Sequence, residues 1–319
     1  MNIFLDPAIL FFIFGVFAGF AKSNLEIPQP ISRFLSLYLL MALGLKGGFA
    51  LHQSGITVEI SLALGLAIFL ATIIPLISYF ILSKTLKKLD AAAIAATYGS
   101  ISAVTFITAT QSLDQHAIQY GGFMAAAMAL MESPAIILAI ILANKARESS
   151  SSNTPQKTSL AKILHESFTD GGQLLLLGSM LIGIVSGDVA HEAMAPFSID
   201  LFKGILAFFL LDMGLQAARS FSQLHSVPKI TIFYALAAPF VHAIFALILC
   251  KLVGLQIGET ILLMVLAASA SYIAVPAVLR QALPEVNPAL YMAMSLGITF
   301  PFNIVFGISL YTYIAQLVF

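Results

Sequence analysis

This sequence contains few charged residues. Charged residues make up 9% of the 319 residues, whereas a soluble domain carries about 25%. Lysine plus arginine and aspartate plus glutamate each number 15, so the net charge is zero and no basic surface for a nucleic acid is predicted. Apolar residues account for 60% of the chain. This composition predicts a membrane protein.

Cysteine and tryptophan are almost missing as well. Cys250 is the one cysteine, which excludes a disulfide within the chain, and it lies in an apolar run where we expect a small core residue. Without tryptophan, anchoring at the membrane interface falls to tyrosine and the basic residues. The residues before Asp6 carry no basic group, which predicts a retained first helix rather than a cleaved signal. Metal-ligand spacings and nucleotide-binding glycine loops are also missing.

What the sequence contains instead is long apolar runs, and a spanning helix needs about 20 such residues. Ten runs are predicted to span, at 8–21, 31–52, 58–83, 91–112, 119–144, 169–187, 197–220, 228–253, 258–282 and 288–318. A polar, serine-rich linker at 145–165 separates five runs in 1–144 from five runs in 166–319. The predicted fold is an all-α polytopic membrane protein of ten transmembrane helices.

The basic residues predict how these helices are oriented. Twelve of the 15 fall on one side, and Lys46, Lys203 and Lys251 fall towards the other. The positive-inside rule then places the linker in the cytoplasm and both termini outside. Because each half holds an odd number of helices, the second half enters the membrane in the opposite sense, so we expect two inverted repeats.

Two serine-bearing stretches interrupt apolar runs at matching places. Ser100 and Ser102 in the fourth run stand 169 positions before Ser269 and Ser271 in the ninth. Polar breaks at corresponding positions of two halves point to the substrate site of a transporter. The alternative is a purely structural role, in which small residues permit close helix packing and each serine hydroxyl bonds the backbone of its own helix.

The breaks predict two broken helices, four and nine, that cross at the midplane. Half-helix N-termini offer N–H groups to an anion, and we expect Pro276 to free the carbonyl of Tyr272. Freed carbonyls and hydroxyls suit Na⁺. The candidate substrate-binding residues are Gly99, Ser100, Ser102, Ala103, Thr105, Ser269, Ser271 and Tyr272. The candidate sodium ligands are Ser102, Thr105, Ser269, Ser271 and Glu132.

Three ionisable residues inside apolar runs need an explanation, because such residues are costly in a membrane. Glu132 is either an ion ligand or a carboxylate bonded between packed helices. Asp212 is expected to pair with Lys46, and His242 to form an interhelical hydrogen bond. An intramembrane protease using Ser102 and His242 is the enzymatic alternative. We do not favour it, because the serines are duplicated and a protease needs one nucleophile.

Ordered motifs along nearly the whole chain resemble one family, the sodium-dependent bicarbonate transporters first described in cyanobacteria. These motifs include Gly44-Leu45-x-Gly47-Gly48, Gly99-x-x-Ser102-x-x-Thr105, Ala238-Pro239-x-Val241-His242, Ala267-Ala268-Ser269-x-Ser271 and Asn287-Pro288. The resemblance implies an elevator-type carrier. Helices one, two, six and seven form its scaffold, and the broken helices hold substrate and Na⁺. It also implies a homotrimer and, in some members, regulation by a PII-like protein.

The sequence departs from the family pattern at the predicted site. Tyr272 stands where the family carries an aspartate, and Glu132 replaces a fifth-helix aspartate; hydroxyls are lost at Val104, Ala270 and Ala274. One Na⁺ with one bicarbonate is neutral and needs no further carboxylate. We therefore expect weaker or fewer-ion sodium coupling, with the Tyr272 hydroxyl donating to the anion.

The prediction is thus a non-enzymatic carrier that imports bicarbonate across a bacterial inner membrane, with Na⁺ as coupling ion and no other cofactor. Three alternatives stay open. The substrate could be another small anion such as a monocarboxylate, sodium coupling could be lost, or the protein could be a channel.

Overall fold

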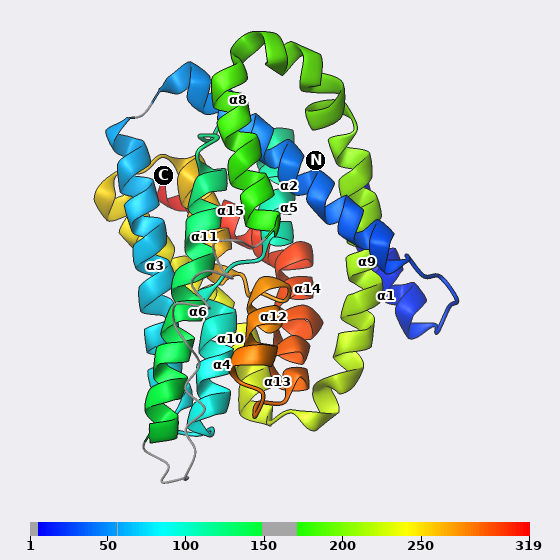
Figure 1. Ribbon diagram of the computed structural model, residues 1–319, viewed down its shortest axis with the longest axis vertical. Coiled ribbons are helices and arrows are strands. Elements are labelled where there is room, and N and C mark those ends of the chain that lie inside the picture. Colours follow the sequence, from blue (N-terminus) through cyan, green and yellow to red (C-terminus); the bar gives the residue numbers. More distant parts are fainter. Residues whose placement is uncertain (1–5, 56, 149–170) are drawn as a thin grey trace.

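The computed structural model describes residues 6–55, 57–148 and 171–319, and Figure 1 shows that their regular structure is helical throughout. The first half contains α1 (Pro7–Phe20), α2 (Gln29–Ser54), α3 (Val58–Leu82), α4 (Lys88–Gly99), α5 (Ala103–Gln115) and α6 (Met124–Glu148). The second half contains α8 (Gly171–Ala195), η2 (Pro196–Asp200), α9 (Phe202–Phe221), η3 (Ser222–Ser226), α10 (Lys229–Val253), α11 (Ile257–Ala268), α12 (Ala274–Ala282), α13 (Pro288–Met294), η4 (Ser295–Thr299), α14 (Phe300–Phe302), η5 (Asn303–Gly307) and α15 (Ile308–Val318).

Local sequence signals fix several helix ends. Asp6 caps α1, because its carboxylate accepts the amide of Ala8 at 2.7 Å and Pro7 follows as the first helical residue. Asn287 caps α13 in the same way, followed by Pro288. Gly254 ends α10 in the left-handed conformation that glycine adopts most easily.

Seven helical stretches of the described residues are long and apolar enough to cross a membrane. Pro7–Phe20 and Ile257–Ala268 are shorter apolar helices, and one of the seven stretches, Gly171–His225, covers two predicted runs. The membrane-protein prediction is supported, whereas the count of ten crossings stays a prediction. The predicted linker begins inside α6, which continues to Glu148, and its remainder lies outside the described residues.

The last predicted run is not broken at Pro301. From Pro288 to Val318 the chain stays helical, with two π-helical turns, η4 and η5, on either side of α14. Such wide turns accommodate a proline without ending the helix.

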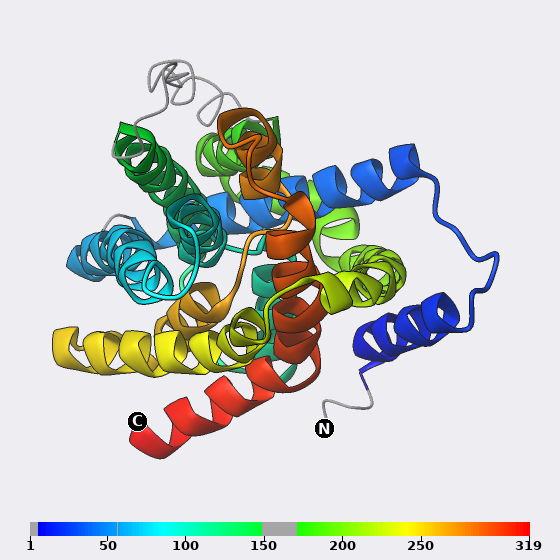
Figure 2. The same cartoon turned by 90° about the horizontal axis from the view of Figure 1, so that it is seen from below.

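Two helix pairs lie beside a larger bundle, as Figures 1 and 2 show together. α1 packs along α9, and α2 packs along α8. The bundle joins α3, α4 and α6 on one side with α10, α11 and the α13–α15 segment on the other. Each pair therefore combines one helix from the first half of the chain with one from the second.

Glycine makes the contact between α2 and α8 close. A Cβ on Gly48 would collide with the carbonyl oxygen of Met180, and a Cβ on Gly183 would come within 2.8 Å of the Leu45 oxygen. Small residues at such crossings let two backbones approach, which is the usual way that membrane helices pack.

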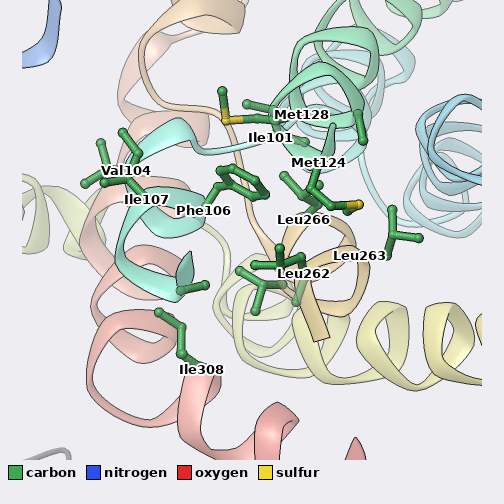
Figure 3. Packing of buried hydrophobic residues seen from close by; sticks show 14 of the residues in the cluster. Ile101, Val104, Phe106, Ile107, Met124, Met128, Leu262, Leu263, Leu266 and Ile308 are labelled. Atoms are coloured by element: carbon green, nitrogen blue, oxygen red, sulfur yellow. The ribbon is translucent and has the colours of Figure 1, made fainter. Parts of the chain in front are cut away.

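Apolar side chains from three other helices pack against α5. Figure 3 shows that residues of α5 and of the segment before it meet α11, α6 and α15. The labelled members of this core are Ile101, Val104, Phe106, Ile107, Met124, Met128, Leu262, Leu263, Leu266 and Ile308. The core holds the first turn of α5 against the end of α11, which positions the site described below.

The glycine contact gives a prediction. Replacing Gly48 by Ala should destabilise the protein by about 1–3 kcal/mol, because the added methyl group forces α2 away from α8. Gly65→Ala is the matched control, since a Cβ there meets no atom within 4 Å. Thermal unfolding in detergent checks both, and equal melting temperatures for the two variants would contradict the close packing.

Candidate functional site

The first break separates α4 from α5. Gly99 ends α4 where a Cβ would come within 2.6 Å of the Pro75 ring, so only glycine fits beside that ring. Ser100 is extended, with φ −97° and ψ 179°. Ser102 then caps α5, because its hydroxyl oxygen accepts the amide of Thr105 at 3.2 Å and the hydroxyl of Thr105 at 2.9 Å.

The second break separates α11 from α12. Ser269 follows the end of α11 in an extended conformation, and its hydroxyl donates to the Leu266 carbonyl at 2.8 Å. The Ser271 hydroxyl accepts the amide of Val275 at 3.2 Å. Because α12 begins at Ala274, Pro276 lies in its first turn. In that turn a missing N–H removes no helical bond, so Pro276 is not what frees the Tyr272 carbonyl.

Two hydrogen bonds join the breaks directly. The Ser102 amide donates to the Ser269 hydroxyl at 3.0 Å, and the Ser271 amide donates to the Thr97 carbonyl at 2.8 Å. All four residues are at least 97% buried. Each break thus satisfies backbone groups that the other leaves without a helical partner.

The hydroxyls of Ser100 and Tyr272 lie in the breaks and are buried. Neither makes a hydrogen bond of normal geometry with another described residue. The Tyr272 hydroxyl approaches Ser102, and its ring packs against Phe300 with centroids 5.0 Å apart. Ser269, in contrast, both donates and accepts. The hydroxyls of Ser100 and Tyr272 are therefore the ones that remain available for a ligand.

Asn303 of η5 supports the second break, a role that was not predicted from the sequence. Its amide donates to the Ala268 carbonyl, the last of α11, at 2.8 Å, and its oxygen accepts the Tyr311 hydroxyl at 3.0 Å. A Cβ on Gly307 would come within 2.5 Å of the same oxygen. The signal available in the sequence was an asparagine inside an apolar run, two residues after Pro301.

The other predicted ionisable residues lie in different contacts. Glu132 accepts a hydrogen bond from Gln173 of α8, where α6 packs against α8. His242 of α10 bonds the carbonyl of Ala267, which agrees with the interhelical interpretation. Its Nδ1 has no partner among the described residues.

The predicted ion pair between Asp212 and Lys46 is wrong. Asp212 accepts hydrogen bonds from Ser32 and Gln216. Lys46 instead pairs with Asp114 of α5, at 3.0 Å. Two neutral donors and the charge of the nearby Arg219 thus take the place of the expected lysine.

A cavity of 470 Å³ lies next to the site and was also not predicted. It is lined by α2, α5, the segment before α6 and the start of α6, and it extends to Phe106 in the first turn of α5. The Lys46–Asp114 pair lies in its wall.

The electrostatics of the breaks favour a small anion. The stretches 98–106 and 267–277 contain no charged side chain. Both α5 and α12 begin there, and the first N–H groups of a helix carry partial positive charge. Among the described residues no group of three or more His, Cys, Asp or Glu side chains could hold a metal ion.

The sequence matches a model of a known protein family. A model of the Na⁺-dependent bicarbonate transporter superfamily matches residues 7–316, nearly the whole chain. No curated protein matches the chain.

The role of Asn303 gives a prediction. Asn303→Leu should destabilise the protein by about 1–3 kcal/mol, because it leaves the Ala268 carbonyl buried without a donor. Thr312→Val is the matched control, since the Thr312 hydroxyl bonds a carbonyl of its own helix. Thermal unfolding and amide exchange of residues 267–273 are the measurements. Unchanged exchange in Asn303→Leu would show that Asn303 does not hold the break.

Proposed function

Because the chain belongs to the Na⁺-dependent bicarbonate transporter superfamily, we propose that it imports bicarbonate across the bacterial cytoplasmic membrane with Na⁺ as coupling ion. The observation that carries this proposal is the contact between the two breaks. It joins the two breaks, from which α5 and α12 begin, in a buried and uncharged place, and each break carries one hydroxyl without a hydrogen-bond partner among the described residues.

Bicarbonate fits the donors that this place offers. The anion has three oxygens in a plane, which accept hydrogen bonds from the Ser100 and Tyr272 hydroxyls and from the first N–H groups of α5. Helix N-termini bind anions through such groups. Tyr272 supplies a neutral donor where a carboxylate would repel the substrate, so the tyrosine favours the anion at the expense of a cation.

The replacement of the family's aspartate by Tyr272 affects sodium binding most, because it removes a negatively charged oxygen ligand. Na⁺ takes oxygen ligands, and hydroxyl and carbonyl oxygens around Ser102, Thr105, Ser269 and Ser271 are the ones proposed. We leave Glu132 out of this set, because its carboxylate accepts from Gln173. A single Na⁺ travelling with one bicarbonate is neutral, so the membrane potential does no work on the pair, whereas each net charge would gain about 2.3 kcal/mol per 100 mV.

The inverted repeat is supported by equivalent elements. α4 and α11 have 12 residues each and end in extended serines, Ser100 and Ser269. With α8 and α9 taken as the counterparts of α1 and α2, the pair α1–α9 corresponds to the pair α2–α8. This favours α1, α2, α8 and α9 as the scaffold of an elevator-type carrier. The homotrimer and a PII-like regulator complete the proposal by family resemblance.

A monocarboxylate is the second candidate substrate, and one observation favours it. The Tyr272 and Phe300 rings form an apolar surface beside the Tyr272 hydroxyl. A short carbon chain would lie against such a surface more easily than a third oxygen would.

Uptake of labelled bicarbonate into proteoliposomes tests the substrate and the ion. We expect uptake to rise in proportion to external Na⁺ and to change little with the imposed membrane potential. A second-order dependence on Na⁺ would contradict the one-ion proposal. Uptake of acetate without uptake of bicarbonate would favour the second candidate.

Three matched substitutions test the site in the same assay. Ser100→Ala and Tyr272→Phe should each raise the KM for bicarbonate about tenfold, the effect of losing one hydrogen bond to an anion. Ser269→Ala should lower the melting temperature, because the Ser269 hydroxyl joins the two breaks. Its effect on the KM for bicarbonate should be smaller than the effects of the other two substitutions. If Tyr272→Phe leaves KM unchanged, the tyrosine is not a ligand.

A further inference from the structure

The 470 Å³ cavity beside the site has an unusual wall. Thirteen residues line it, and the charged ones among them are Lys46 and Asp114. Their side chains are 29% and 40% exposed, so both reach solvent while remaining in contact at 3.0 Å. An otherwise neutral cavity thus contains one positive and one negative group.

The cavity follows one face of α5 towards the breaks. Phe106, Thr110 and Asp114 are spaced four residues apart and therefore lie on the same face of the helix. Asp114 is in the exposed last turn of α5, and Phe106 is in the first turn. The amide of Phe106 bonds the carbonyl of Ser102 at 3.1 Å, so the inner end of the cavity adjoins the first break.

Lys46 is held at the cavity by two neighbours. Besides Asp114, its ammonium group lies 5.6 Å from the centre of the Phe202 ring of α9. The Tyr120 hydroxyl lies beside Asp114 and Thr110. A lysine whose charge is only partly neutralised attracts a passing anion, and the paired aspartate competes with that anion for the ammonium group.

We propose that this cavity is the vestibule through which the anion reaches the breaks, and that the Lys46–Asp114 pair is its charge filter. The proposal rests on the proposed function in one respect, the identification of the breaks as the substrate site. The ligand class is a small monovalent oxyanion. Lys46 attracts the anion, and Asp114 weakens the binding of the anion to Lys46 by pairing with the ammonium group.

Opposite effects of two substitutions distinguish a filter from a structural ion pair. Lys46→Met leaves a negative vestibule and should lower kcat/KM for bicarbonate uptake about threefold. Asp114→Asn leaves a positive vestibule and should raise it about threefold, an effect typical of one partly screened charge. The double variant should stay close to wild type. A decrease in both single variants would mean that the pair only fastens α2 to α5, and would overturn the proposal.

A second readout does not depend on the substrate. Gln119→Cys puts a thiol on the exposed wall of the cavity, and the parent chain is the control because Cys250 is fully buried. In detergent, the labelling rates with anionic sulfonatoethyl and cationic trimethylammonioethyl methanethiosulfonate are compared. Asp114→Asn should raise the anion-to-cation ratio and Lys46→Met should lower it, about threefold each.

The two readouts separate the possible failures. If the ratios shift as expected but the wild type takes up no bicarbonate, the proposed substrate is wrong and the charge filter stands. If the ratios do not shift, the vestibule has no filter. If the labelling ratios shift but neither substitution changes kcat/KM for bicarbonate uptake, the cavity lies off the transport route and the proposal is overturned.

Discussion

The rest of this structure depends on the hydrogen bonds that join the two helix breaks. Interrupting a helix in an apolar interior leaves amides and carbonyls unpaired, at a cost of about 2–7 kcal/mol for each group left without a partner. Ser102 with Ser269, and Ser271 with Thr97, remove part of that cost by pairing one break with the other. Neither break would be stable in this position alone, so the two halves of the chain must meet here.

This constraint explains the arrangement around the breaks. Gly99 fits against Pro75 and lets α4 end beside α3. Asn303, held by Tyr311, takes the last carbonyl of α11. Within the breaks, the Ser100 and Tyr272 hydroxyls have no hydrogen-bond partner among the described residues, and they are the ones that we propose a substrate uses. The two half-sites are not equivalent, because one offers a serine hydroxyl and the other a phenol next to Phe300.

The sequence was sufficient to predict the helical class, the positions of both breaks and the serines that form them. Serine within an apolar run acts locally, because its hydroxyl bonds backbone groups a few residues away, so its effect on a helix can be predicted without knowing the neighbours of that helix. Proline was less informative, since Pro276 lies in the first turn of α12 and Pro301 lies in a continuous helical segment. Pairings between distant helices could not be predicted in this way. Lys46 and Asp212 have opposite charges, but Lys46 lies at the cavity beside Asp114, while Asp212 accepts hydrogen bonds from Ser32 and Gln216. The role of Asn303 was not predicted for the same reason, since its amide bonds a carbonyl 35 positions away in the sequence.

The central claim is that an anion binds where the two breaks touch, and local amide exchange in the presence and absence of bicarbonate tests it most directly. The account predicts slower exchange in both 98–106 and 267–277 when bicarbonate is added with Na⁺, and no change when chloride replaces it. Protection of only one stretch, or of neither while another region becomes protected, would contradict it.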